Sequence, residues 1–213
     1  MTEPDARRPI ASRDAAWSKR TAAWLARTGV TPNQISVASM VCAALAAALL
    51  YGAAHTLGGL RTGLLIGAIV ACQGRLLCNL FDGMVAIEGG LAAKDGPFWN
   101  EFPDRVSDTL ILVAAGYAAG SLALGWAAAA LAIATAYVRE LGRAVGAPAD
   151  YRGPMAKQHR MALLCAALAV SAIEPFWNWQ GESLQIALLV IALGSGLTVL
   201  RRATAQVSAL KSG

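Results

Sequence analysis

Polar residues interrupt an otherwise apolar sequence between positions 79 and 108, at spacings that place them on shared helical faces. One group stands at i, i+3, i+4 and i+7: Asn79, Asp82, Gly83 and Ala86. A second group recurs every four residues: Asn100, Asp104 and Asp108. Hard oxygen donors of this kind suit Mg²⁺ or Mn²⁺, and such ions commonly bridge to phosphate groups. The two groups therefore predict a metal-assisted site for phosphate chemistry.

The segment between the two groups, residues 88–97, is short and rich in glycine. A short linker predicts that the helices on either side are antiparallel neighbours, with their polar faces converging. The flanking sequence is apolar enough for lipid, where carboxylates are costly and usually functional. We therefore expect a cage of carboxylates and amides just inside a membrane.

The composition of the chain also indicates a lipid membrane environment. The chain has 213 residues, of which 56% are hydrophobic and only 15% charged, more apolar surface than one soluble domain can bury. Windows of about 20 residues that could cross the hydrocarbon lie near 33–53, 62–87, 100–120, 122–142, 158–177 and 184–202. We predict an all-α membrane protein in which six transmembrane helices form one domain, residues 33–203.

Residues 1–32 lack the apolar core of a cleavable signal peptide and are expected to remain as a polar arm followed by an amphipathic helix. That helix has an apolar face opposite Lys19, Arg20 and Arg27: Ala16, Trp17, Thr21, Trp24 and Leu25. This pattern is typical of a helix lying at the lipid interface, although a solvent-exposed helix remains an alternative. Residues 204–213 are predicted to form a short cytoplasmic tail.

The basic residues indicate orientation. They gather in the N-terminal arm, between residues 139 and 160, and at the C-terminus, whereas the connection with Glu174 and Glu182 has none. The positive-inside rule then puts both termini in the cytoplasm, and we expect an integral protein of the bacterial inner membrane. The basic residues that give the chain its net charge of +5 flank the predicted spans, and no nucleic-acid-binding motif accompanies them. No nucleic-acid partner is therefore expected.

The polar spacing resembles the signature of the CDP-alcohol phosphotransferases, D-x-x-D-G-x-x-A-R, eight or nine residues, and G-x-x-x-D-x-x-x-D. Here it reads Asn79-x-x-Asp82-Gly83-x-x-Ala86-Ile87, eight residues, Gly96-x-x-x-Asn100-x-x-x-Asp104. Asparagine therefore stands at the first and third aspartate positions, and Ile87 replaces the arginine. Two further segments are similar to the family: Thr31-Pro32-Asn33-x-Ile35-Ser36, and Arg139-Glu140 with Arg143 and then Gly153 to Lys157.

This resemblance implies a membrane enzyme of phospholipid synthesis that transfers a phosphatidyl-type group from a CDP-linked donor, here CDP-diacylglycerol, to a small alcohol and releases CMP. By position, Asp104 is the general base, and the metal ligands are Asn79, Asp82, Asn100 and Asp104. The donor-binding residues are Pro32, Asn33, Asp82, Gly83, Ala86 and Gly96. Homodimers are also expected, from the resemblance alone.

The two asparagines reduce the charge available to a metal. Four carboxylates offset two divalent ions, whereas Asp82 and Asp104 offset only one. An amide oxygen can still coordinate, but it binds more weakly without a charge. We therefore expect at most one tightly held Mg²⁺ or Mn²⁺.

Arg75 lies one helical turn before Asn79, and Asp108 lies one turn beyond Asp104. In antiparallel helices the two side chains should meet, as a structural pair below the cage. In the alternative interpretation, the Arg75 guanidinium reaches a substrate phosphate and takes over part of a missing metal's role.

Basic residues form a second cluster that could bind the donor's phosphate or an anionic acceptor: Arg139, Arg143, Lys157 and Arg160. The alternative is that they obey the positive-inside rule or bind anionic lipid head groups.

For the chain as a whole, two functions stay open. One is the phosphotransferase, and the other is a non-catalytic relative that binds nucleotide or lipid as a scaffold or regulator.

Overall fold

The computed structural model describes residues 15–91 and 93–212, and these fold into helices without a strand among them. The elements are α1 (Ala16–Arg27), α2 (Pro32–Ala54), α3 (Gly58–Glu88), α4 (Gly96–Ala118), α5 (Leu122–Ala144), α6 (Lys157–Ser171), the 3-10 helix η3 (Glu174–Trp177) and α7 (Glu182–Ser212). The predicted all-α class is confirmed. Residues 1–14, most of the predicted polar arm, lie outside the described residues.

Four of these helices are long and apolar enough to cross a membrane: α2, α3, α5 and α7. The other two predicted spans differ from that description. Helix α4 carries Asp104, Arg105 and Asp108 along its length, and α6 has only 15 residues. The predicted segment 158–177 is divided, because α6 ends at Ser171 and η3 follows.

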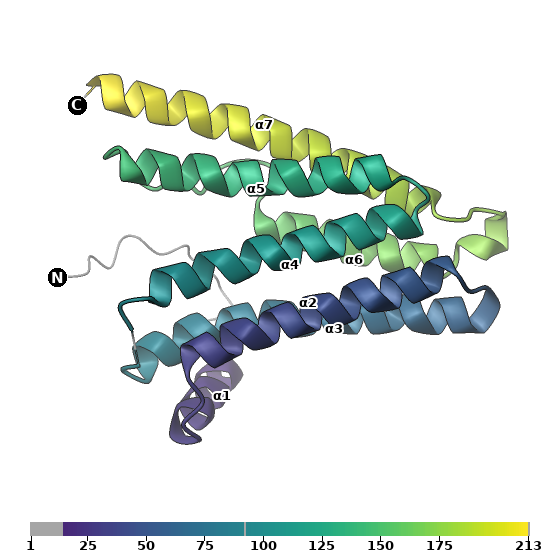
Figure 1. Ribbon diagram of the computed structural model, residues 1–213, viewed down its shortest axis with the longest axis horizontal. Helices are drawn as coiled ribbons and strands as arrows, with labels where there is room; N and C mark the ends of the chain where they lie inside the picture. Colours follow the sequence, from purple (N-terminus) through teal and green to yellow (C-terminus); the bar gives the residue numbers. More distant parts are fainter. Residues whose placement is uncertain (1–14, 92, 213) are drawn as a thin grey trace.

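The six long helices run side by side, and α3 and α4 point in opposite directions (Figure 1). Helices α3 and α4 touch each other at few positions, however, because α2 packs against both. The short linker therefore does not produce the expected direct packing of the two helices. Helix α5 joins α4 to α7, and α6 packs against α3 and α7, so that α6 closes the bundle opposite α2.

The start of α2 is set by its sequence. Thr31 Oγ1 accepts a hydrogen bond from the Gln34 amide, Gln34 Oε1 accepts one from the Thr31 amide, and Pro32 occupies the first turn. This capping box satisfies amides that a helix start leaves without partners. In the same first turn, Asn33 Nδ2 donates to Asp95 Oδ2 at 3.0 Å and ties this end of α2 to the linker before α4.

Glycines allow α4 and α5 to cross closely. A Cβ atom added to Gly116 would lie 2.6 Å from the Cα of Gly125, which no side chain can tolerate. Small residues at helix crossings are typical of membrane bundles, where close backbone approach takes the place of large apolar side chains. The crossing brings the rest of α5, including Arg139, alongside the start of α4.

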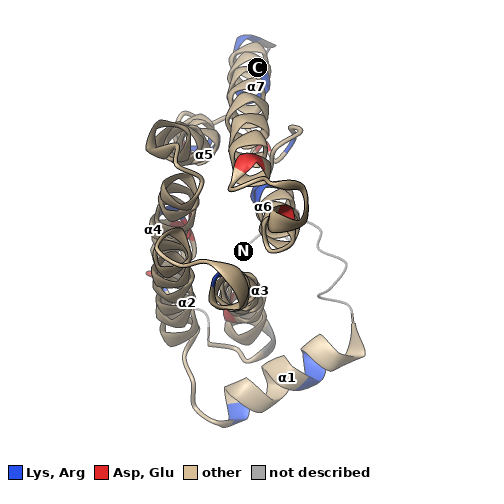
Figure 2. Cartoon of the chain, turned by 90° about the vertical axis from the view of Figure 1, so that its right-hand side faces the viewer, with Lys and Arg blue, Asp and Glu red and all other residues tan. Residues whose placement is uncertain are grey.

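Helix α1 lies across the side of the bundle, next to α3 (Figure 2). Its Ser18 and Ala22 are buried, and Trp17 packs edge-on against Phe81 of α3 with ring centroids 6.0 Å apart. Trp24 stays 61% exposed, as expected for a side chain that contacts lipid head groups. At the other end of the chain, α7 continues to Ser212, so the predicted tail extends this helix.

Candidate functional site

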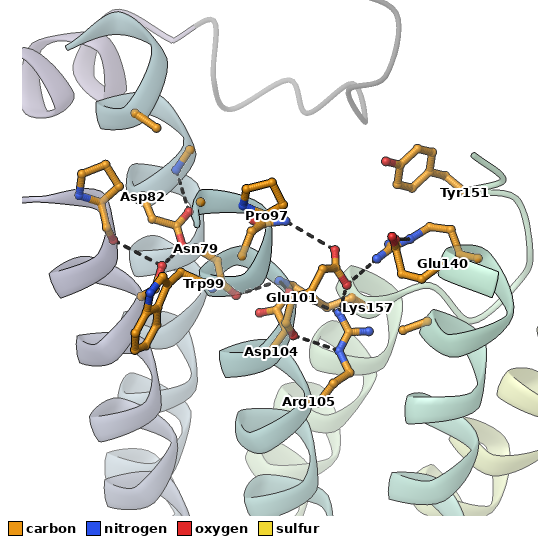
Figure 3. Close-up of a pocket in the computed structure, with 18 of the residues that line it drawn as sticks. Asn79, Asp82, Pro97, Trp99, Glu101, Asp104, Arg105, Glu140, Tyr151 and Lys157 are labelled. Carbon is orange, nitrogen blue, oxygen red and sulfur yellow. Dashed lines mark hydrogen bonds and ion pairs between the residues drawn. The ribbon is translucent and has the colours of Figure 1, made fainter. Parts of the chain in front are cut away.

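A cavity of about 580 Å³ opens where α3 ends and α4 begins. Helices α2, α3, α4, α5 and α6 all contribute side chains to it, as Figure 3 shows in close-up. The predicted site residues that line it are Pro32, Asn33, Asn79, Asp82, Gly83, Ala86, Gly96, Asn100, Asp104, Arg139, Arg143, Lys157 and Arg160. Arg75 and Asp108 are not among the lining residues and lie beneath the cavity floor. The helical spacing thus brought Asp82 and Asp104 to one space.

Asp82 is held from two directions. Its Oδ2 accepts a hydrogen bond from Ser36 Oγ of α2 at 2.9 Å, and its Oδ1 accepts one from the Gly83 amide at 2.6 Å. The carboxylate is buried, with 4% of the residue exposed. Ser36 was missed as a site residue, although it belongs to the Thr31–Ser36 segment that the resemblance singled out. Its role is to orient Asp82 toward the cavity.

Asp104 lies among three cations, of which Arg105 is the most distant, with its Nη2 3.9 Å from Asp104 Oδ2. Lys157 Nζ donates to its Oδ2 at 2.5 Å, and Arg75 Nη2 donates to its Oδ1 at 3.2 Å. The Lys157 ammonium also donates to Asn79 Oδ1 at 2.7 Å. Lys157 is the first residue of α6, so this ammonium connects three helices at one point. A lysine predicted to bind substrate phosphate is thus found between the predicted metal ligands.

Below the cavity, Arg75 and Arg160 hold Asp108. Arg75 Nη2 donates to Asp108 Oδ1 at 2.7 Å, and Arg160 Nη2 donates to Asp108 Oδ2 at 2.8 Å. Arg75 is fully buried, consistent with the predicted structural pair. The pair is larger than expected, because Arg75 also reaches Asp104 and Arg160 also donates to the Met155 carbonyl. The network is not fully satisfied, because Arg75 Nε and Nη1 and Arg160 Nε are buried without a hydrogen-bond partner among the described residues, which is costly for buried charges.

Glu101 organises the rim of the cavity. Its carboxylate pairs with Arg105 Nη2 at 2.6 Å and with Arg139 Nη2 at 2.5 Å. Arg139 also pairs with Glu140 and lies over the Tyr151 ring, 5.3 Å from its centroid. On an ideal helix Glu101 is rotated about 100° from Asn100, but its longer side chain reaches across to Arg139 of α5. The i, i+4 spacing of Glu101 and Arg105 was the available signal.

The predicted cationic cluster is therefore largely neutralised by carboxylates. Arg139 pairs with Glu101, and Arg160 pairs with Asp108. The side chain of Arg143 pairs with Glu140 at 3.0 Å but stays 50% exposed. Asn100 is also exposed at the rim, and its amide donates weakly to Glu101 at 3.4 Å. Arg143 is thus the cation of this cluster best placed to meet an anion from solution.

The donor set limits what metal the site can hold. No group of three or more His, Cys, Asp or Glu suited to a metal occurs among the described residues. A divalent ion at Asp104 would stand against Lys157 and Arg75, and like charges at that range repel strongly. Asp82 faces the cavity without a cation in hydrogen-bond contact. The residues present fit one ion at Asp82, completed by substrate oxygens, and do not fit a second at Asp104.

No family model matches the sequence, and no curated protein sequence matches it. Solved structures do match. The phosphatidylinositol phosphate synthase PgsA1 of Mycobacterium tuberculosis with CDP-DAG bound superimposes with a TM-score of 0.74 at 19% identity, covering 90% of this chain and 94% of that one. Its complex with manganese and citrate gives 0.73, also at 19% identity, over 89% and 88%. The chain thus has the fold of that synthase.

Proposed function

We propose that the protein is a membrane enzyme of phospholipid synthesis, a CDP-alcohol phosphotransferase that moves a phosphatidyl-type group from CDP-diacylglycerol to an alcohol. One observation carries the proposal. The signature positions on α3 and α4, from Asn79 to Ala86 and from Gly96 to Asp104, line one cavity in a fold shared with a synthase that has been solved with CDP-DAG bound.

The proposed reaction is a displacement at phosphorus. The acceptor hydroxyl oxygen forms a bond to the phosphorus that carries the diacylglycerol, the bond from that phosphorus to CMP breaks, and CMP leaves with the bonding electron pair. Asp104, as the catalytic base, takes the hydroxyl proton. Its position fits this role, because it lies on the cavity wall and is 6% exposed. Exclusion of water from such a site favours transfer over hydrolysis.

The donor would lie along α2, α3 and the start of α4. Gly83 lets its phosphates approach the α3 backbone, and Pro32, Asn33, Ala86 and Gly96 line the same side. One Mg²⁺ or Mn²⁺ at Asp82 would neutralise pyrophosphate charge when bound. Arg143, at the opposite rim, would attract an anionic acceptor such as a sugar phosphate or glycerol phosphate.

In this proposal α4 and α6 complete a six-span membrane domain with both termini in the cytoplasm, because their charged residues face the cavity and the bundle rather than lipid. Asp104 and Asp108 are buried in the bundle. The cavity then opens at the cytoplasmic face of a bacterial inner membrane. A homodimer is part of the proposal through the likeness of fold only.

The non-catalytic alternative has one observation in its favour. Asp104 is engaged by both Lys157 and Arg75, and two signature carboxylates are replaced by amides. A chain that only binds nucleotide or lipid would keep the cavity and could lose the base.

A measurement of CMP release distinguishes the phosphotransferase from the non-catalytic relative. Purified protein is supplied with CDP-diacylglycerol and a panel of alcohols, in Mg²⁺, in Mn²⁺ or in chelator, and CMP is measured by chromatography. The phosphotransferase releases CMP in step with one alcohol. Absence of CMP under every condition, with CDP-diacylglycerol still bound, would establish the scaffold.

A further inference from the structure

Lys157 has an unusual position for a substrate-binding lysine. Its ammonium is in hydrogen-bond contact with Asn79 at 2.7 Å and Asp104 at 2.5 Å, and these are two of the four positions predicted to hold metal. The side chain remains 24% exposed and lines the cavity. We propose that this ammonium is a permanent cation of the site, which takes the place of a second divalent ion at Asp104 and binds the donor's phosphate. The phosphate part of this inference rests on the proposed function.

The charges of the site support the proposal. Three carboxylates, Asp82, Asp104 and Asp108, are matched by three cations, Arg75, Lys157 and Arg160, which pair with Asp104 and Asp108. Arg105, 3.9 Å from Asp104, is itself matched by Glu101. The site is therefore neutral by formal charge before any ion enters. A divalent ion at Asp104 would add two positive charges beside those of Lys157, Arg75 and Arg105, which Coulomb repulsion opposes.

The asparagine at position 79 fits an ammonium better than a metal. A neutral amide oxygen accepts a hydrogen bond from Lys157 at full strength, whereas it gives a divalent ion no compensating charge. An aspartate at this position would instead leave the site with one negative charge in excess. Asn79 and Lys157 are thus two parts of one arrangement.

The scaffold fixes Lys157 where it is needed. The residue begins α6, and the preceding Met155 amide donates to Thr198 Oγ1 of α7 at 3.1 Å. One turn later, Arg160 is anchored to Asp108 and to the Met155 carbonyl. An ammonium has three N–H donors, and Asn79 and Asp104 take two of them within the described part of the chain. The third can meet a phosphate oxygen in the cavity.

Binding of Mn²⁺ alone tests this inference without any donor. Free Mn²⁺ is followed by electron paramagnetic resonance as it is titrated into purified protein, for the wild type, Lys157→Met, Lys157→Arg and the control Lys211→Met at the far end of α7. The wild type, Lys157→Arg and Lys211→Met should bind at most one ion per chain. Lys157→Met should bind Mn²⁺ at least about tenfold more tightly, because the repulsion at Asp104 is relieved.

Two results would overturn the inference: two ions per chain in the wild type, or equal Mn²⁺ affinity in Lys157→Met and Lys157→Arg. If Lys157→Met does not fold, the wild-type stoichiometry decides. Because the titration contains no CDP-linked compound, its outcome is independent of CMP release. A failed proposal of function would therefore be seen separately.

Discussion

Two buried carboxylates, Glu174 of η3 and Asp104 of α4, lie near opposite ends of α6 in contrasting surroundings. At the end remote from the cavity, Glu174 is fully buried and accepts hydrogen bonds from the Ser171 hydroxyl and the Gly181 and Ser183 amides at 2.7 to 2.9 Å. Arg61 lies 3.7 Å away. At the cavity end, Asp104 is held by two long cationic side chains and lies on the wall of an open space.

Under the proposed function, this difference separates a structural carboxylate, Glu174, from a reactive one, Asp104. The Glu174 cluster, defined as Glu174 with Arg61, Ser171, Gly181 and Ser183, is held mainly by backbone and short side chains that cannot move independently. The partners of Asp104 are a lysine and an arginine on other helices. A substrate phosphate can draw the Lys157 ammonium toward itself, whereas nothing can enter the Glu174 cluster.

The largest expected effect is on activity. Asp104→Asn removes the proposed base and should lower the rate of CMP release by about a thousandfold, within the usual range for general base catalysis. The control is Glu182→Gln at the opposite end of the bundle, which should keep the wild-type rate. Equal rates in Asp104→Asn and wild type would end the assignment of Asp104.

Replacing Glu174 should lower the stability of the protein and leave its activity unchanged. Glu174→Ala leaves Arg61 and two amides without their buried partner, which costs about 3 kcal/mol and lowers the unfolding temperature in detergent by about 10 °C. Differential scanning fluorimetry measures the shift. At temperatures where this variant is still folded, its rate of CMP release should match the wild type; a loss comparable to that of Asp104→Asn would break the comparison.

A smaller effect is expected at the rim. Arg143→Gln removes a half-exposed cation with one carboxylate partner, so the KM for an anionic acceptor should rise by about tenfold with little change in kcat. Initial rates over a range of acceptor concentrations give both constants. An unchanged KM would show that Arg143 instead helps to orient the protein in the membrane or binds lipid head groups. Arg201→Gln, an exposed arginine on α7, is the matched control.

The smallest effect is on the pH dependence of stability. Burial works to raise the pKa of Glu174, which lies in the connection between α6 and α7, but hydrogen bonds from Ser183, Ser171 and Gly181 outweigh burial and hold the pKa below its ordinary value of 4.5. Its stabilising effect is therefore complete above pH 4.5 and is lost as the pH falls through the lowered pKa.

The corresponding measurement compares unfolding temperatures of the wild type and Glu174→Gln between pH 7 and pH 3. The difference should be constant down to about pH 5 and shrink below it. A difference that grows on acidification would contradict this account of the Glu174 cluster.

The sequence predicted the elements well because helical periodicity and hydropathy are local properties. The spacing of Asn79, Asp82 and Gly83 was sufficient to place them on one face, and the observed α2 and α5 agree with the predicted spans within two residues at each end. The division of the segment 158–177 was missed, because an apolar run does not reveal where a helix stops. The extent of helix pairing was missed too, since chain connectivity suggested that α3 packs along α4. Instead α2 packs against both, and α3 reaches α4 at few positions, among them the contacts of Arg75 with Asp104 and Asp108.

Long-range contacts within the site could not be derived from spacing. Lys157 is far along the chain from Asn79 and Asp104, and only the fold brings its ammonium between them. One of the two interpretations of Arg75 made it the cation that takes over part of a missing metal's role, because Arg75 shares a face with Asn79. The structure gives that position to Lys157 and leaves Arg75 beneath the cavity, in contact with Asp104 and Asp108.

A crystal structure of the protein with CDP-diacylglycerol is the most direct test of the central claim that this cavity is the donor site. We predict the pyrophosphate within hydrogen-bond distance, about 3 Å, of Lys157 Nζ, with its phosphates beside Gly83 and Asp82. Nucleotide density elsewhere on the protein, with the cavity between α3 and α4 free of it, would contradict the account.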